Sequence, residues 1–146
     1  MNTQTVILLV EDSADDEMLT KRAFLKQQIL NPMVVCRDGA EALDYFLGAD
    51  GAKNLSGRTH LVLLDLNLPK VSGLEVLAQL RANPATALMP IIVLTSSDED
   101  TDLREAYRLG ANSYIRKPVD FNSFANVAAQ IGPYWLVVNP PPPVAA

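Results

Sequence analysis

Three runs of the chain are apolar without interruption. Val6–Val10, Leu61–Leu64 and Ile91–Leu94 consist only of Val, Ile and Leu and do not alternate with polar residues. Strands that are covered on both faces of a sheet have this pattern, because neither face meets water. Two shorter stretches, Met33–Cys36 and Ser113–Arg116, are weaker strand candidates. The pattern therefore predicts five strands.

Segments with apolar residues near helical spacing separate these strands. Gly132 and Pro133 are expected to end the last of them. The alternation of strand and helix predicts an α/β fold with a five-stranded parallel sheet, since parallel strands need crossover connections. The predicted helices cover Ala14–Gln28, Ala40–Leu47, Gly73–Ala82, Leu103–Leu109 and Phe121–Ile131.

Two segments lie outside this alternation. Gly48–Gly57 contains Gly, Asp, Asn and Ser and is interpreted as a flexible insertion. Pro140–Pro143 favours extended polyproline geometry, which cannot join a helix or a central strand. The length fits one domain with its own core. We therefore expect a domain over residues 1–132 and a C-terminal apolar and proline-rich extension over residues 133–146.

The start of this extension is apolar. The segment Tyr134–Val138 follows the predicted end of the last helix, and such a segment seldom stays in water. It either folds back onto its own domain or packs against another protein. Aromatic side chains suit interfaces. We expect Tyr134, Trp135 and Leu136 to contact a second copy of the chain or another partner, and we favour a homodimer.

Polar side chains follow four of the five predicted strands, at the point where each strand ends. The carboxyl ends of the strands in an open parallel sheet meet at one edge, where ligands bind, so these side chains should converge. The residues are Glu11 and Asp12 after the first strand, Asp65 after the third, Thr95 and Ser96 after the fourth, and Lys117 after the fifth.

Three carboxylates gathered at one place would raise one another's pKa values unless a cation lay among them. An all-oxygen site with one or two carboxylates, a carbonyl and waters is the kind that Mg²⁺ accepts. We expect Asp12 and Asp65 to be ligands, with Glu11 binding directly or through water and the Asn67 carbonyl completing the protein side.

A carboxylate can attack phosphorus when a metal and a cation stabilise the transferring oxygens. Asp65 follows the third strand and is central among the polar residues at the strand ends, so it is the candidate nucleophile. Lys117 supplies the positive charge. Thr95 can donate a hydrogen bond to a phosphoryl oxygen, and Ser96 follows it in sequence. Each residue alone is ordinary, since a single Asp after a strand is commonly a turn residue or a helix cap. Their order along the chain suits one phosphoryl pocket.

Composition and charge narrow the classes of function. The 49% hydrophobic and 20% charged residues are typical of a globular protein. The net charge of -5 disfavours a domain that neutralises nucleic-acid phosphates. The sequence shows no signal peptide and no apolar run near the ~20 residues that span a bilayer. We expect a cytoplasmic protein without nucleic-acid or membrane partners.

The single cysteine and the single histidine are not expected to carry chemistry. Cys36 lies in an apolar stretch and excludes an internal disulfide or a cysteine-clustered zinc site. His60 opens the third strand, at the end opposite Asp65, so the phosphoryl pocket is out of its reach.

Four segments together resemble the receiver domain of bacterial two-component response regulators, which is related to the chemotaxis regulator fold. The resemblance implies a flavodoxin-like, doubly wound sheet with strand order 2-1-3-4-5. It also implies that a histidine kinase phosphorylates Asp65. The segments are Ile7–Asp16, Leu61–Gly73, Ile91–Ser97 and Gly110–Pro118.

The resemblance implies further roles. Glu11 and Asp12 would be the acidic pair, Thr95 the switch hydroxyl, Tyr114 the aromatic rotamer switch, and Pro118 would follow a cis bond that aims the lysine into the site. Two positions depart from common patterns of the family. The acidic pair is Glu-Asp where Asp-Asp is also common, and Ser96 stands where Ala is frequent, which could alter the lifetime of the phosphoryl group.

The C-terminal flank Ile131–Pro143 and the insertion at Gly48–Gly57 resemble the single-domain regulators paired with phytochrome-type histidine kinases. It implies a phytochrome-type kinase as the partner. Our leading hypothesis is a switch that signals through altered protein–protein contacts, with at most slow self-dephosphorylation rather than enzymatic turnover.

Two other functions remain open. A phosphatase of the haloacid dehalogenase type also uses an Asp nucleophile at a strand end, but it expects a second Asp where this chain has Asn67. A docking module could keep the fold and work without phosphorylation. Nucleotide binding is disfavoured, because the chain has neither glycine-rich phosphate-binding pattern.

Overall fold

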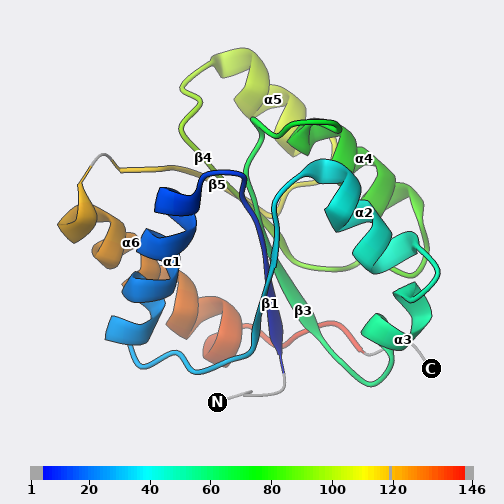
Figure 1. Cartoon of the computed structure of the whole chain (residues 1–146), viewed down its shortest axis with the longest axis horizontal. Helices are drawn as coiled ribbons and strands as arrows, with labels where there is room; N and C mark the ends of the chain where they lie inside the picture. Colours follow the sequence, from blue (N-terminus) through cyan, green and yellow to red (C-terminus); the bar gives the residue numbers. More distant parts are fainter. Residues whose placement is uncertain (1–4, 119, 144–146) are drawn as a thin grey trace.

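The computed structural model describes residues 5–118 and 120–143. Five strands form one sheet in which every neighbouring pair is parallel, in the order β2-β1-β3-β4-β5. The predicted fold class and strand order are therefore confirmed, and Figure 1 shows the sheet at the centre of the molecule. The strands are β1 Val6–Val10, β2 Met33–Cys36, β3 His60–Leu64, β4 Ile91–Thr95 and β5 Ser113–Arg116.

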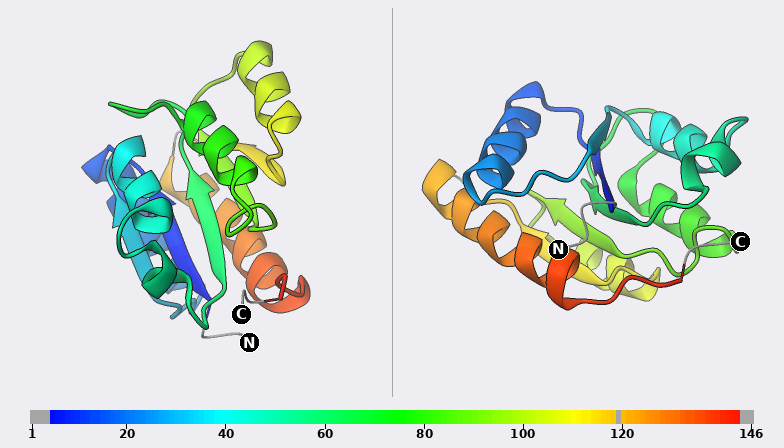
Figure 2. Two further views of the ribbon diagram at one scale, coloured as in Figure 1. Left: turned by 90° about the vertical axis from the view of Figure 1, so that its right-hand side faces the viewer. Right: turned by 90° about the horizontal axis from the view of Figure 1, so that it is seen from below.

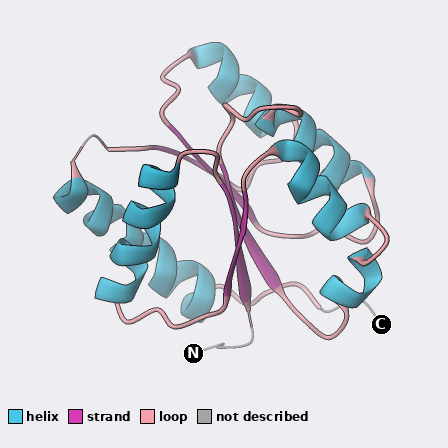
Figure 3. Ribbon diagram, viewed as in Figure 1, coloured by secondary structure: helices cyan, strands magenta, loops and turns pink. Residues whose placement is uncertain are grey.

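Helices cover both faces of this sheet, as Figures 1 and 3 show. Helices α1 and α6 pack together on one face, and α2, α4 and α5 lie on the other. The helices are α1 Ala14–Lys26, α2 Gly39–Leu47, α3 Gly51–Leu55, α4 Gly73–Ala82, α5 Asp100–Arg108 and α6 Phe121–Pro133, followed by the π-helical turn η1 Tyr134–Val138.

The core lies in two layers, one on each face of the central strands. Every residue of β1, β3 and β4 is buried, which explains their unbroken apolar runs. The outer strands β2 and β5 are only half-buried. Each large aliphatic side chain that is fully buried stabilises the fold by about 1.5–3 kcal/mol, so the central strands anchor the loops at their ends.

Side-chain caps define where several helices begin. Ser13 caps α1 and accepts a hydrogen bond from the backbone N–H of Asp16 at 3.2 Å. Asp38 caps α2 and Asp120 caps α6 in the same way, at 2.7 Å and 2.8 Å. Such caps satisfy backbone donors that a helix start leaves free. They fix the turn that leads from each strand end into the next helix.

The segment between β3 and α4 depends on Gly73. A Cβ atom at this position would lie 2.2 Å from the Asp65 carbonyl oxygen and 2.5 Å from the Leu66 Cα. The Gly73 N–H donates to the Leu66 carbonyl at 3.0 Å. The start of α4 is therefore packed directly against the backbone of Asp65.

Two predictions about loops were wrong. The predicted insertion Gly48–Gly57 contains the short helix α3, whose start packs under Phe46, where a Cβ on Gly51 would meet the Phe46 carbonyl. The last helix does not stop at Gly132 and Pro133. It continues through Pro133 into η1, where the Asn139 N–H donates to the Tyr134 carbonyl in a π-helical register.

The extension folds back onto its own domain. Leu136 is buried in the core layer of α1 and α6, Trp135 packs against that layer, and Tyr134 is half-exposed. The prediction that Leu136 contacts a partner is therefore corrected, because its side chain is already covered within the chain. Figure 2 shows the end of α6 and the segment after it running beneath the sheet. Within residues 5–118 and 120–143, no helix is both long and apolar enough to cross a membrane.

Candidate functional site

The register of the sheet brings the predicted acids together. Val10 pairs with Leu64, so Glu11 and Asp65 leave the sheet side by side at its carboxyl edge. The Asp65 N–H donates to the Val10 carbonyl at 3.1 Å, which extends the ladder by one residue. Glu11 and Asp65 are buried, whereas Asp12 is exposed. One carboxylate oxygen from each of the three lies within 4.8 Å of the others.

Lys117 reaches this cluster from the end of β5. Its Nζ donates to Asp65 Oδ2 at 2.9 Å, to Asp16 Oδ2 at 2.9 Å, and to Glu11 Oε1. Only 7% of the lysine side chain is exposed. The Lys117 N–H donates to the Thr95 carbonyl at 2.8 Å, which holds the residue against the end of β4. Lys117 is thus a buried cation shared by carboxylates from three parts of the chain.

Burial sets the electrostatics of this ion-pair group. It raises the pKa of Glu11 to about 7, against the opposing pull of Lys117, because a buried carboxylate loses hydration. Burial alone would lower the pKa of Lys117, but the Glu11 and Asp65 carboxylates outweigh it, and the lysine pKa lies above its usual value. Lys117 therefore stays charged, and the acids around it outnumber it.

Both oxygens of Asp65 are held in place. The Thr95 hydroxyl donates to Asp65 Oδ1 at 2.8 Å, and the Asn67 backbone N–H donates to the same oxygen at 3.1 Å. Lys117 holds Oδ2. Thr95 is itself fully buried. The carboxylate is thus oriented by a hydroxyl, a backbone amide and an ammonium group, which are the donors a transferred phosphoryl group also needs.

A chain of contacts connects Thr95 to Tyr114. The Ser97 N–H donates to the Thr95 hydroxyl oxygen at 3.3 Å, and the Tyr114 hydroxyl donates to the Ser97 carbonyl at 3.3 Å. The Ser97 hydroxyl donates to Asp102 in α5 at 2.6 Å. Tyr114 is half-buried in β5, and burial raises the pKa of its hydroxyl. A displacement of Thr95 would therefore reach both Tyr114 and α5 through Ser97.

The remaining predicted site residues lie on the solvent-exposed side of the phosphoryl site or next to it. Ser96 and Asn67 are both exposed next to the buried Thr95 and Asp65. The predicted cis bond before Pro118 is wrong, because the described residues contain no cis peptide bond. The physical reason is that Lys117 already reaches the carboxylates from a trans bond, which costs less than the cis form.

Two residues of the site were missed in the sequence. Asp16 was included only as the last residue of the segment Ile7–Asp16 in the resemblance, yet it binds Lys117. Ser97 was included only in the resemblance, and it connects Thr95 to Tyr114. Asp16 lies in the first turn of the helix that directly follows Glu11 and Asp12, and that closeness in sequence to the acidic pair was the available signal.

The donor set fits a divalent cation. The cluster offers carboxylate oxygens from Glu11, Asp12 and Asp65 and no nitrogen or sulfur ligand. Hard cations such as Mg²⁺ and Mn²⁺ prefer this kind of site. The exposed Asp12 lies at the solvent side of the cluster, which leaves room for waters in the coordination shell.

Comparisons with known proteins agree with this geometry. The chain is 42% identical over 138 residues to the probable methanogenesis regulatory protein FilR2 of Methanothrix harundinacea, covering 94% of this chain and 87% of that protein. It is 38% identical over 135 residues to the response regulator Rcp1 of Synechocystis sp., covering 92% and 91%.

Solved structures give the same result. The Mn²⁺-bound form of Rcp1 matches with a TM-score of 0.85 at 36% identity, covering 94% of this chain and 99% of that chain. The phosphorylated cyanobacterial phytochrome response regulator RcpA also matches with a TM-score of 0.85, at 33% identity, covering 94% and 98%. The family model of the response regulator receiver domain matches residues 7–129. The chain therefore belongs to the response regulator receiver domain family.

Proposed function

We propose that a histidine kinase transfers a phosphoryl group to Asp65 and that the chain signals through the protein surface this modification changes. The observation that carries the proposal is the Asp65 carboxylate itself, which is held by Thr95, Asn67 N–H and Lys117 at the carboxyl edge of the sheet. Asp65 attacks phosphorus, and the P–O bond forms as the P–N bond to the donor imidazole breaks. The electron pair of that bond remains on the imidazole nitrogen.

Mg²⁺ is the proposed metal. Glu11, Asp12 and Asp65 would hold it with their carboxylates, Glu11 directly or through water, and the Asn67 carbonyl would complete the protein ligands. Support comes from the all-oxygen donor set and from the Mn²⁺-bound form of the relative Rcp1. When bound, the cation neutralises charge on the transferring oxygens.

Lys117, Thr95 and Ser96 are the proposed phosphoryl-binding residues. Lys117 lies close to Asp65 with its charge retained, so it can pair with a phosphoryl oxygen. The Thr95 hydroxyl now donates to Asp65 Oδ1 and would turn to the phosphoryl group once that oxygen carries it. Ser96, exposed beside them, would set how water approaches and hence how slowly the protein dephosphorylates itself.

The signal is a shift between two conformations. Movement of Thr95 would release or tighten the link through Ser97 to Tyr114 and change the surface formed by α5 and β5. Such a shift transmits a signal only if a partner binds one conformation better than the other. The output is thus binding, and the protein is a switch rather than an enzyme with turnover.

A phytochrome-type kinase is the proposed partner, in a cytoplasmic pathway. Support comes from the similarity to RcpA, which is a phytochrome response regulator, over 94% of this chain. A homodimer is the proposed assembly. The exposed ring of Tyr134 and the half-buried Trp135 beside it, 5.2 Å apart between centroids, are the contacts that remain available on the extension.

The test is phosphorylation by a small donor. Wild-type protein and Asp65→Asn are incubated with acetyl phosphate and Mg²⁺, and intact mass is recorded with Asp50→Asn as a matched control at an exposed site. Wild type and the control should gain one phosphoryl group, and Asp65→Asn should gain none. Equal labelling of Asp65→Asn overturns the assignment.

Solution size measured on the same samples tests the assembly. Dimers should form in wild type and weaken in Tyr134→Ser. A wild-type protein that stays monomeric with and without the phosphoryl group overturns the homodimer. The partner is tested by a pull-down with a purified phytochrome-type kinase. If wild-type protein does not bind this kinase, the proposed partner is wrong, whereas the phosphoacceptor role of Asp65 is unaffected.

A further inference from the structure

The last turn of α4 carries an arginine whose side chain joins separate parts of the chain. Arg81 Nε donates to the Gly110 carbonyl at 2.9 Å, and its Nη2 donates to Asn112 Oδ1 at 2.8 Å. Its Nη1 donates to the carbonyls of Ala87 and Met89 at 3.0 Å and 2.7 Å. One guanidinium thus connects the end of α4 to the loop before β4 and to the turn between α5 and β5.

Neutral oxygens hold this arginine. Among the ion pairs of residues 5–118 and 120–143, none includes Arg81. A guanidinium carries its N–H donors in one rigid plane, so it fixes the directions in which its acceptors lie. Arg81 therefore keeps the turn after α5 and the loop before β4 at fixed positions relative to α4.

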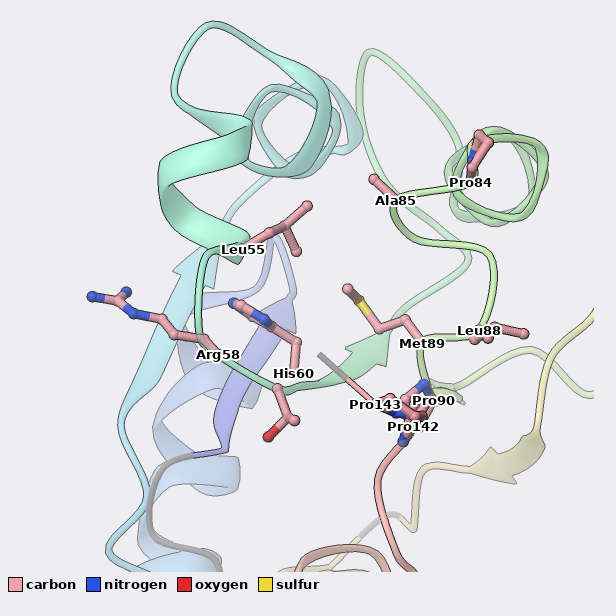
Figure 4. A pocket seen from close by; sticks show the side chains of 11 residues that line it. Leu55, Arg58, His60, Pro84, Ala85, Leu88, Met89, Pro90, Pro142 and Pro143 are labelled. Carbon is pink, nitrogen blue, oxygen red and sulfur yellow. The ribbon is translucent and has the colours of Figure 1, made fainter. Parts of the chain in front are cut away.

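The loop that Arg81 holds lies at the amino edge of the sheet, where β4 begins. Figure 4 shows Pro84, Ala85, Leu88 and Met89 along this loop, which helps to line a mainly apolar pocket of about 240 Å³. Met89 is buried in the core layer that covers this face of the sheet. The contact with the Met89 carbonyl therefore joins Arg81 to a part of the loop that is packed against the core.

Asn112 connects the same arginine to the sheet. Its Oδ1 also accepts a hydrogen bond from the Ile91 N–H at 2.7 Å, and its own N–H donates to the Ile91 carbonyl at 2.9 Å. Ile91 is fully buried at the start of β4. The turn between α5 and β5 is therefore held both by α4 and by a central strand.

Helix α5 itself buries little apolar surface. Ala106 is the only one of its nine residues that is buried, and an alanine side chain contributes little to packing. Polar contacts hold the two ends of the helix instead. The Ser97 hydroxyl donates to Asp102 at 2.6 Å near the start, and Arg81 holds Gly110 just after the end. The position of α5 thus depends largely on these two contacts.

The two ends differ in their connection to the phosphoryl site. Near the start, the Ser97 N–H donates to the Thr95 hydroxyl oxygen, and that hydroxyl donates to Asp65. The end is held by Arg81, which lies eight residues after Gly73, or about 12 Å along α4 from the turn packed on the Asp65 backbone. A displacement of Thr95 therefore acts directly on the start of α5 and not on its end.

We propose that Arg81 holds the C-terminal end of α5 in place, so that a displacement of Thr95 moves the N-terminal end of the helix about this fixed point. The inference rests on the proposed phosphorylation of Asp65 and specifies the movement that it produces. Arg81 is a positioning residue, because it acts through Gly110 and the turn after α5. The surface that changes is then that of residues 97–104, whereas residues 107–112 stay in place.

The test follows the backbone amides of the full chain by ¹H–¹⁵N NMR, with Mg²⁺ and with beryllofluoride as a mimic of the phosphoryl group. In wild type, beryllofluoride should shift the amides of residues 97–104 and leave those of residues 107–112 nearly unchanged. In Arg81→Met, the amides of residues 107–112 should shift as well, because this end of α5 is no longer held.

Hydrogen exchange tests the contact without any phosphoryl mimic. In Arg81→Met, exchange of the Ala111 and Asn112 amides, measured relative to that of the β1 amides, should become about tenfold faster, since loss of a hydrogen bond changes local opening by roughly this factor. The ratio to β1 separates local release from a general loss of stability. Asn112→Ala removes one acceptor at an exposed position and should change Ala111 in the same direction but by less. Arg104→Met, at an exposed position of α5, is the matched control and should behave as wild type.

Two outcomes overturn this role of Arg81 while leaving phosphorylation of Asp65 intact. Equal shifts at both ends of α5 in wild type would mean that the C-terminal end moves too. Shifts and exchange ratios in Arg81→Met that match wild type would mean that Arg81 does not hold this end. If beryllofluoride shifts no amide of wild type, the proposed function fails instead, and the exchange ratios still decide whether Arg81 holds the end of the helix.

Discussion

The carboxyl edge and the amino edge of the sheet differ in the kind of side chains that they bring together. At the carboxyl edge, Lys117 and the acids around it form a buried, charged group in which each member is held by another. At the amino edge, mainly apolar side chains line a pocket together with a neutral histidine and Arg58. β3 joins the two, from His60 to the residue before Asp65. One strand thus begins beside a mainly apolar pocket at the amino edge and ends next to a buried, charged group at the carboxyl edge.

Removal of the buried cation should produce the largest effect. Lys117→Met leaves Glu11 and Asp65 without their shared partner, and we expect the free energy of unfolding without metal to fall by about 3–5 kcal/mol. Mg²⁺ should restore more stability to this variant than to wild type, because the cation takes over the neutralising role. Urea unfolding with and without Mg²⁺ measures both, with the exposed Lys53→Met as control. A loss under about 1 kcal/mol would contradict the shared-cation interpretation.

At the amino edge, the next largest effect is expected from the side chain that anchors the C-terminal extension, Leu136. Leu136→Ala removes a buried side chain from the core layer of α6, and we expect a loss of about 3 kcal/mol. Phosphorylation of Asp65 should be unaffected, since the change is remote from the carboxyl edge. Thermal unfolding and intact mass after acetyl phosphate measure the two effects. Leu25→Ala, at a 62%-exposed leucine of α1, should stay within about 0.5 kcal/mol of wild type. An equal loss there would mean that the loss in Leu136→Ala does not depend on the burial of Leu136.

The stability contributed by His60 at the amino edge should depend on pH. The folded pKa of His60 is about 4, below its usual value near 6.5, so between these values the unfolded chain binds a proton that the folded chain does not. The stabilising contribution is therefore complete above pH 6.5 and is lost as pH falls toward 4. From pH 7 to pH 5, wild type should lose about 2 kcal/mol more than His60→Phe in urea unfolding. Parallel pH profiles of the two proteins would show that His60 titrates normally.

The central strands could be predicted from sequence because a strand that is buried on both faces has an uninterrupted run of apolar residues. The runs at Val6–Val10, Leu61–Leu64 and Ile91–Leu94 match β1, β3 and β4 to within one residue. The helix at α3 and the turn η1 could not be predicted, because Gly51 and Pro133 usually end helices. Tertiary contacts, such as the burial of Leu136, overcame those local preferences.

The site was predictable for a different reason. Strand ends in a parallel sheet meet at one edge, so the positions of Glu11, Asp65, Thr95 and Lys117 in sequence implied that they meet in space. Asp16 was missed because an acid in a first helical turn is common without any partner in the tertiary structure. The isomer of the peptide bond between Lys117 and Pro118 could not be predicted either, since sequence alone does not decide between cis and trans.

The smallest effect is expected at Asp16, which separates two explanations of how the carboxyl edge holds Lys117. Its carboxylate binds the lysine at 2.9 Å, but its side chain is 36% exposed, whereas those of Glu11 and Asp65 are almost fully buried. Solvent screens such a contact, so Asp16→Asn should cost less than about 1 kcal/mol and leave labelling of Asp65 intact. Urea unfolding and the rate of labelling measure both effects, with Asp15→Asn in the same helical turn as the control. A loss comparable to that of Lys117→Met would mean that Asp16, rather than the buried pair, holds the lysine in place.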